Sequence, residues 1–316
     1  MFRSANEAMN CIVLNKAGVS YEDLTCLYPR LQSFYTKWEM EYDCVAGRDW
    51  MRSSPWLPFL AVALYGIFIV WGKAAMKSSK EWNWRSIMAF WNLSLSTFSW
   101  MGLIRTLPHL IHNMYNYSLE EVFCNDPESA FGSGSTGLWV QLFILSKFPE
   151  LIDTFFIVIH KKPLIFLHWY HHVTVLLYCW HSYVSSAPTG LFFVVMNYAV
   201  HAIMYGYYFL MAVGMKPKWL KGYYITAAQI TQMIAGVAVT ILSFYYYNKY
   251  NSGSGRRDDK HDGGGTNKCY IQKENNTAAF VMYGSYLFLF LQFFVGRYTW
   301  GNLSKRKRTA MKKKQN

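Results

Sequence analysis

Residues 223–247 read YYITAAQITQMIAGVAVTILSFYYY, a run without a single charged side chain. A helix rises about 1.5 Å per residue, so a helix of this length crosses the hydrocarbon core of a bilayer, which is about 30 Å thick. Similar apolar runs occur along most of the chain. We therefore predict an all-α integral membrane protein with spans at residues 56–71, 87–107, 138–159, 164–183, 191–213, 223–247 and 278–300. These make seven transmembrane helices, or six if the third run is re-entrant.

The composition agrees with a membrane protein. The 316 residues are 53% hydrophobic and 19% aromatic, and only 16% are charged, against about 25% in soluble domains. The formal net charge is +13, but the excess lies in short segments between the apolar runs and in the tail. This distribution is typical of cytosolic loops under the positive-inside rule and does not indicate nucleic-acid binding.

The charge pattern predicts how the chain is divided. We expect a lumenal N-terminal segment (1–54), a membrane domain (55–300) and a basic cytosolic tail (301–316). A Gly-rich lumenal insert at about 250–275 is expected to be flexible. The chain ends KKQN, which resembles a dilysine retrieval signal, so we predict a multi-pass protein of the endoplasmic reticulum membrane with a cytosolic C-terminus.

The expected lumenal side contains most of the cysteines. That compartment permits disulfides, and Cys124 and Cys269 lie in two different lumenal loops. A bridge between them and two free thiols are both compatible with the sequence.

Charged residues interrupt the third span. Such residues are costly in a membrane and usually face the interior of the bundle. Lys147 and Glu150 are spaced i, i+3 and can pair, Asp153 lies close to the same face, and Pro149 is expected to kink the helix. A structural ion pair and a direct catalytic role for Lys147 and Glu150 both fit.

The fourth span contains His168, His171 and His172. Their spacing places all three imidazoles on one helical face. Each buried ring needs hydrogen-bond partners, so core packing does not explain the cluster. Metal ligation and nucleophilic or acid–base chemistry remain as alternatives.

The next two spans also contain polar stripes. Asn197, His201 and Tyr205 share one face of the fifth span, and Gln229 and Gln232 recur in the sixth. His201 alone is typical of a satisfied core histidine, but beside the other histidines it becomes a candidate functional residue. The glutamines fit interhelical hydrogen bonding and contact with a thioester or a pantetheine amide equally well.

Four segments, in order and on consecutive spans, together resemble the family called elongation of very-long-chain fatty acids proteins. The matching residues are Lys147, Glu150, Asp153 and Thr154; His168, His171 and His172; His201, Met204, Tyr205, Tyr207 and Tyr208; and Thr226, Gln229 and Gln232. The resemblance covers about residues 55–300. It implies a 3-oxoacyl-CoA synthase, an acyltransferase that condenses acyl-CoA with malonyl-CoA in the first step of microsomal fatty acid elongation. It also implies six of the seven helices around an acyl tunnel closed at the lumenal end, and it supports the Cys124–Cys269 bridge.

The stretch HWYHH at 168–172 resembles the subgroup that acts on saturated and monounsaturated chains of about C16. The resemblance also assigns His171 as the nucleophile that holds the chain as an acyl-imidazole, a choice that spacing alone does not make. His201 would promote decarboxylation or stabilise the enolate, while His168 and His172 would orient His171 and set its tautomer. The candidate hydrogen-bond donors are Asn197, Tyr205 and Gln229.

The expected substrates are acyl-CoA and malonyl-CoA, with no metal and no further cofactor. The CoA phosphates are expected to meet Lys161, Lys162, Lys216, Lys218 or Arg297 at the cytosolic mouth. Expected partners are the lipid bilayer and the 3-oxoacyl-CoA reductase, dehydratase and enoyl-CoA reductase of the cycle. A homo-oligomer is also compatible with the sequence, whereas the exact chain-length preference does not follow from it.

Two other classes of protein compete with this interpretation. A di-iron membrane desaturase or hydroxylase needs about eight histidines on one side of the membrane. Here, His109 and His112 are expected about 30 Å from His168, across the hydrocarbon core. A non-enzymatic seven-helix receptor or transporter is the other alternative, although no inverted repeat is evident.

Overall fold

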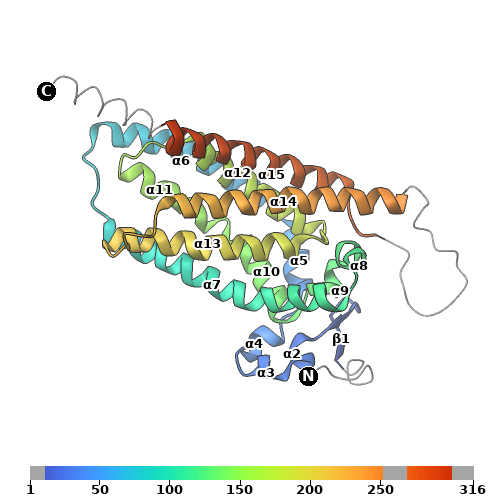
Figure 1. The fold of residues 1–316 in the computed structure, drawn as a ribbon. Coiled ribbons are helices and arrows are strands. Elements are labelled where there is room, and N and C mark those ends of the chain that lie inside the picture. Colours follow the sequence, from blue (N-terminus) through green and yellow to red (C-terminus); the bar gives the residue numbers. More distant parts are fainter. Residues whose placement is uncertain (1–10, 252–268, 301–316) are drawn as a thin grey trace, which may run out of the picture.

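The computed structural model describes residues 11–251 and 269–300, and helices dominate it. Long helices lie side by side in an elongated bundle, and a small unit that contains the N-terminus is attached near one end (Figure 1). The bundle consists of α6 (Trp56–Ser78), α7 (Arg85–Asn116), α10 (Gly134–Ser146), α11 (Ile152–Ile159), α12 (Phe166–Val184), α13 (Gly190–Val213), α14 (Gly222–Asn251) and α15 (Lys273–Phe294), which continues as the π-helix η2 (Val295–Trp300). Two short helices, α8 (Leu119–Cys124) and α9 (Pro127–Phe131), connect α7 to α10.

Within the described residues, five helices are long and apolar enough to cross a membrane: α6, α7, α13, α14 and the helix Lys273–Tyr298. The predicted class, a helical membrane protein with several spans, is therefore confirmed. The fourth predicted span is the single helix α12, which is not among these five. The predicted set of seven spans thus exceeds what length and composition establish for these helices.

The third predicted span is not one helix. The chain forms α10, then the 3-10 turn η1 (Pro149–Leu151), then α11. Pro149 has no N–H to donate, and its ring clashes with the carbonyl of the preceding turn, so the α-helix cannot continue through it. The expected local kink is in fact a complete interruption, and it places Lys147 and Glu150 on either side of the proline.

Helices α7 and α13 pack closely along much of their length. A side chain at Gly102 of α7 would collide with the ring of Tyr198, because a Cβ there would lie 2.2 Å from it. Nearby, Ser96 Oγ of α7 donates to the carbonyl of Ala202 over 2.8 Å. Small residues that permit close approach and interhelical hydrogen bonds are typical of membrane bundles, where lipid provides no hydrophobic drive for helix association.

Helix α6 lies at the margin of the bundle, where it contacts α11 and α12. Most of its apolar side chains are exposed, among them Phe59, Ile67 and Val70. Such a surface suits a lipid environment. Tyr65 is one of the few residues of α6 that is buried against its neighbours.

We call residues 11–54 the N-terminal cap. Strands β1 (Ile12–Leu14) and β2 (Ser20–Glu22) pair antiparallel, and a disulfide joins Cys11 to Cys26. The helices that follow are α2 (Leu24–Leu27), α3 (Pro29–Gln32), α4 (Lys37–Met40) and α5 (Cys44–Ser53). The apolar pattern of the sequence predicts only that this segment precedes the first span, and it misses both the hairpin and this disulfide.

Glu39 fastens the cap to the bundle. Its Oε1 accepts hydrogen bonds from Arg105 Nε of α7 (3.1 Å) and from Trp139 Nε1 of α10 (2.7 Å). Burial by itself raises the pKa of Glu39, but hydrogen bonds from the Thr36 N–H, Trp139 and Arg105 outweigh it and hold this pKa below its usual range. The carboxylate is therefore charged where it meets Arg105.

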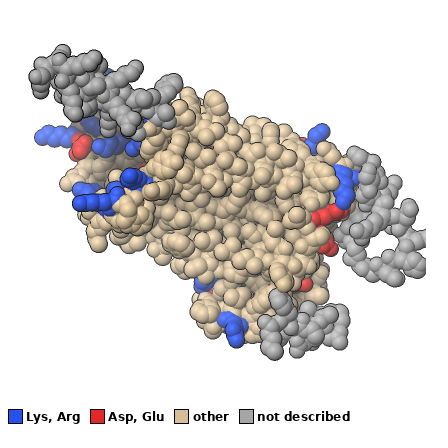
Figure 2. All heavy atoms as spheres, in the orientation of Figure 1, with Lys and Arg blue, Asp and Glu red and all other residues tan. Residues whose placement is uncertain are grey.

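Charged side chains gather at the two ends of the bundle, and the flank between them in Figure 2 is almost free of charge. Lysines and arginines predominate at the end where α7 begins and α13 ends (Figures 1 and 2). There, Arg85 Nε donates to the carbonyl of Ala212 near the C-terminus of α13, a position where the helix dipole favours a cation. The basic end matches the side that the positive-inside rule predicts to be cytosolic.

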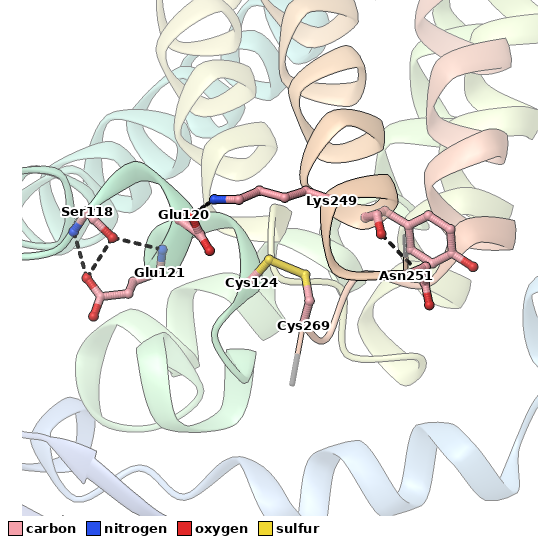
Figure 3. Close-up of a disulfide and its surroundings, with 8 residues drawn as sticks. Ser118, Glu120, Glu121, Cys124, Lys249, Asn251 and Cys269 are labelled. Atoms are coloured by element: carbon pink, nitrogen blue, oxygen red, sulfur yellow. Dashed lines mark hydrogen bonds and ion pairs between the residues drawn. A yellow bond between two sulfur atoms is a disulfide. The ribbon is translucent and has the colours of Figure 1, made fainter. Parts of the chain in front are cut away.

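At the opposite end, a disulfide joins Cys124 of α8 to Cys269 (Figure 3). This is the pair that the sequence analysis singles out. The N–H of Tyr270 donates to the carbonyl of Cys124 over 3.0 Å, and Lys249 forms an ion pair with Glu120 beside the bridge. The predicted flexible insert lies largely in residues 252–268, outside the described residues, as does the tail at 301–316.

Candidate active site

The histidines of α12 gather in the interior of the bundle. The ring centroids of His168 and His172 are 4.4 Å apart, and those of His171 and His172 are 5.6 Å apart. The structure therefore places the three imidazoles together, as their spacing predicts.

His171 has a ring nitrogen that makes no hydrogen bond with the described residues. Its Nδ1 is buried without a hydrogen-bond partner among the described residues. Its ring packs against Tyr286 of α15 at 4.9 Å, and the Tyr286 hydroxyl donates to the backbone carbonyl of His171 over 3.3 Å. Backbone and ring are thus held in place while the ring nitrogens remain available to a reactant. Buried polar atoms without partners are rare and often functional.

His201 of α13 faces the same region. It is buried, and Asn197, one turn earlier on the same helix, contacts Lys147. The edge of the His201 ring meets Tyr205 at 5.3 Å. Helix α13 therefore contributes a buried imidazole one turn from Asn197, the residue that contacts Lys147.

Lys147 and Glu150 form a buried ion pair beside the histidines. Lys147 Nζ lies 2.6 Å from Glu150 Oε1, and the two residues are 2% and 4% exposed. Ser146 Oγ donates to the same carboxylate oxygen over 2.9 Å, and Lys147 also donates to Asn197 Oδ1 over 3.3 Å. The predicted pairing is confirmed, and Asn197 accepts through Oδ1, which leaves the donor hydrogens of its Nδ2 for another group.

Asp153 is the hydrogen-bond partner of Tyr205, which is another of the expected donors. Its carboxylate accepts a hydrogen bond from Tyr205 Oη (2.6 Å) and another from Trp91 Nε1 (2.7 Å). The hydroxyl of Tyr205 is therefore committed to Asp153 and does not point to a reacting carbonyl. The expected role of Tyr205 as a donor to a reacting carbonyl therefore stays a prediction, which requires its hydroxyl to leave Asp153.

The glutamines of α14 are positioned differently from each other. Gln229 Nε2 donates to the sulfur of Met204 over 3.2 Å. A thioether is a weak acceptor, so this amide keeps donor capacity for a ligand. Gln232 is buried.

The expected orientation of His171 by its two neighbours does not run through hydrogen bonds, although the rings are in contact. Within the described residues, neither His168 nor His172 forms a hydrogen bond with it. His168 Nε2 instead bonds to Thr154 Oγ1 (2.9 Å), which in turn bonds to Tyr65 Oη of α6 (2.7 Å). The sequence analysis misses Tyr65, because nothing in an apolar span distinguishes a tyrosine that reaches a site from one that faces lipid.

His109 and His112, on the predicted lumenal side, have partners away from this cluster. His109 bonds to Thr136 (2.9 Å), and His112 lies 3.0 Å from Glu22 of the N-terminal cap. Among residues 11–251 and 269–300, no group of three His, Cys, Asp or Glu side chains has an arrangement that could hold a metal ion.

An apolar cavity lies between α10, α12 and α13. Cys179, in its wall, follows His171 by about two helical turns, or roughly 12 Å along α12. Residues of the cap also line it, including Cys44 and Arg48 of α5. Its apolar walls include Val140, Ile144, Phe193 and Val194.

A polytopic helical bundle with histidines and an ion pair in its interior defines a class of membrane-embedded proteins with an intramembrane site. The family model for the ELO, or GNS1/SUR4, family matches residues 50–310, and the chain belongs to this family.

Named relatives share the same region. The chain is 38% identical over 251 residues to very long chain fatty acid elongase 6 of Drosophila melanogaster. The aligned region covers 79% of this chain and 75% of that protein. It is 37% identical to the protein of that name from Rattus norvegicus, over 79% and 87% of the two chains. Fatty acid elongase 3 of Trypanosoma cruzi (strain CL Brener) is 35% identical over 84% and 91%.

Proposed function

We propose that this chain is a very-long-chain 3-oxoacyl-CoA synthase that elongates saturated or monounsaturated acyl-CoA of about C16. The observation that carries this proposal is Nδ1 of His171, which is buried and has no hydrogen-bond partner among the described residues. A nucleophile needs a free lone pair, and a dry cavity protects an activated acyl group from water. Family membership and the names of the relatives support the same reaction.

The first half-reaction transfers the acyl group to the protein. A ring nitrogen of His171 adds to the thioester carbonyl, the C–S bond breaks, and CoA leaves as the thiol after it takes the imidazole proton. The product of this step is an acyl-imidazole. His201 and the Lys147–Glu150 pair lie near enough to influence the charge that develops on the carbonyl oxygen.

The second half-reaction forms the carbon–carbon bond. Malonyl-CoA loses CO₂, and the electron pair of the broken bond attacks the acyl carbon. The bond to His171 breaks, and the departing ring nitrogen takes up one proton from the medium, so the neutral imidazole is regenerated and 3-oxoacyl-CoA is released. His201 stabilises the enolate in this scheme. No cofactor takes part beyond the two thioester substrates.

We also propose how the helices lie in the membrane for this reaction. The interrupted segment α10–η1–α11 and α12 complete seven spans, and six of these enclose the acyl tunnel. The basic end faces the cytosol of an endoplasmic reticulum membrane, where CoA meets lysines such as Lys161 and Lys216. A reductase, a dehydratase and an enoyl reductase must then process the product, because a 3-oxo group has to be removed before the next cycle.

A condensation assay tests the proposal. Protein purified in detergent is incubated with [14C]malonyl-CoA and with acyl-CoAs of graded length. We expect labelled 3-oxoacyl-CoA, with the highest rate near C16, and no product when either substrate is omitted. Folded protein that makes no product with any chain length would contradict the assignment.

The apolar cavity is proposed to hold the end of the acyl chain, and Val194→Phe is expected to shorten the preferred substrate. The added ring occupies the space of terminal methylenes. Each buried methylene is worth about 0.8 kcal/mol, so chains that reach the ring should lose roughly tenfold in kcat/KM for each two-carbon unit.

The matched control is Ile203→Phe, because Ile203 lies on the same helix and is exposed. It should leave the chain-length profile unchanged. Measuring kcat/KM against chain length for both variants decides the question, and identical profiles would show that the chain ends elsewhere.

A further inference from the structure

Tyr65 connects a marginal helix to the histidine cluster. Most of α6 is exposed, but Tyr65 is 5% exposed and its ring centroid lies 6.4 Å from that of His172. Its hydroxyl lies 2.7 Å from Thr154 Oγ1, and the same oxygen lies 2.9 Å from His168 Nε2. Thr154 is fully buried. A phenol, an alcohol and an imidazole therefore form one buried chain of hydrogen bonds.

The hydrogen atoms of this chain can be placed by counting donors. Each hydroxyl has one hydrogen to donate. Thr154 is the hydrogen-bond partner of the Tyr65 hydroxyl among the described residues, so Tyr65 must donate to it or bury an unsatisfied O–H, which is costly. Thr154 then has its own hydrogen free for His168. His168 Nε2 is therefore an acceptor, and its proton is on Nδ1.

We propose that Tyr65 is a positioning residue that holds His168 in the Nδ1–H tautomer through Thr154. The Nε2 lone pair of His168 is occupied by the Thr154 hydroxyl, so this histidine does not compete with His171 for the acyl group. His168 contacts His172 at 4.4 Å, and His172 contacts His171 at 5.6 Å. A fixed His168 ring thus supports the orientation of the ring that reacts.

The catalytic part of this inference rests on the proposed function, whereas the tautomer does not. The first test is solid-state NMR of protein labelled with 15N-histidine in lipid, without substrate. His168→Gln assigns the His168 signals by their disappearance. We expect a protonated Nδ1 and an unprotonated, hydrogen-bonded Nε2 in the wild type. A protonated Nε2 would overturn the proposal, whether or not the protein condenses thioesters.

Tyr65→Phe removes the terminal donor and keeps the ring. It is expected to change the His168 signals to a mixture of tautomers and to lower kcat about fivefold, with KM for acyl-CoA unchanged. The matched control is Tyr198→Phe, because Tyr198 is also buried and donates over 2.8 Å to the carbonyl of Trp139. This control should lose stability without any change in the His168 tautomer.

Substitutions at Thr154 separate the relay from packing. Thr154→Val keeps the shape but has no hydroxyl, so it should reproduce both effects of Tyr65→Phe. Thr154→Ser keeps the hydroxyl and should restore the wild-type tautomer and kcat. If the His168 tautomer changes in Tyr65→Phe but kcat stays at the wild-type value, the positioning role is wrong. If Thr154→Ser behaves like Thr154→Val, the hydrogen-bond relay itself is wrong.

Discussion

His171→Ala is expected to lower kcat for condensation by on the order of 10⁴, because removing a covalent nucleophile leaves only binding and electrostatic contributions. The effect should be on kcat rather than on KM for acyl-CoA, since the imidazole acts after the substrate is bound. The measurement is formation of labelled 3-oxoacyl-CoA under saturating substrate. His181→Ala is the matched control, because His181 lies on the same helix and is exposed, and it should retain activity close to the wild type.

The same variant separates the two half-reactions. With acyl-CoA alone, the wild type should release one equivalent of CoA per active site and carry an acyl group on His171. His171→Ala should release none. An acyl group mapped by mass spectrometry to His201 or His172 would contradict the assignment of the nucleophile, although the condensation reaction itself would stand.

Lys147→Met is expected to destabilise the bundle by about 3–5 kcal/mol, since it leaves the Glu150 carboxylate buried without a countercharge. The side chain of Lys147 is 1% exposed and that of Glu150 is 5% exposed, so water cannot replace the missing partner. To measure the effect, samples in detergent are heated, and the folded protein that remains is quantified by size-exclusion chromatography. Lys37→Met breaks the exposed Lys37–Glu41 pair and should leave the melting temperature near that of the wild type.

The double variant Lys147→Met/Glu150→Gln decides between the two roles that the sequence leaves open for this pair. It removes both charges and should recover most of the lost stability. Recovery of activity together with stability would show that the pair is structural. A stable but inactive double variant would show that the charge itself acts on the substrate, while a double variant as unstable as Lys147→Met would contradict the ion-pair explanation.

Part of the candidate site is predictable because it depends on one helix at a time. Helical spacing places His168, His171 and His172 on one face, and it allows Lys147 to meet Glu150 three residues later. The structure shows both arrangements. The same local reasoning fails at Pro149, where it predicts a kink but not the full break between α10 and α11.

The hydrogen-bond partners could not be predicted in the same way. Tyr205 is committed to Asp153, 52 residues earlier in the chain, and Tyr65 reaches Thr154, 89 residues later. Nothing near either tyrosine in the sequence indicates these partners. The N-terminal cap is a further example, since Glu39 finds Arg105 and Trp139 on two different helices.

The sequence by itself determined that this chain is a helical membrane protein and which side chains share a helical face. A helix in lipid satisfies its backbone hydrogen bonds within the segment, so its existence and its faces depend on local residues. Only the tertiary structure decided which helices meet, and therefore which partner each buried polar group takes. Packing between distant segments makes that choice: it occupies Tyr205, holds His168 through Thr154, and leaves the ring of His171 free.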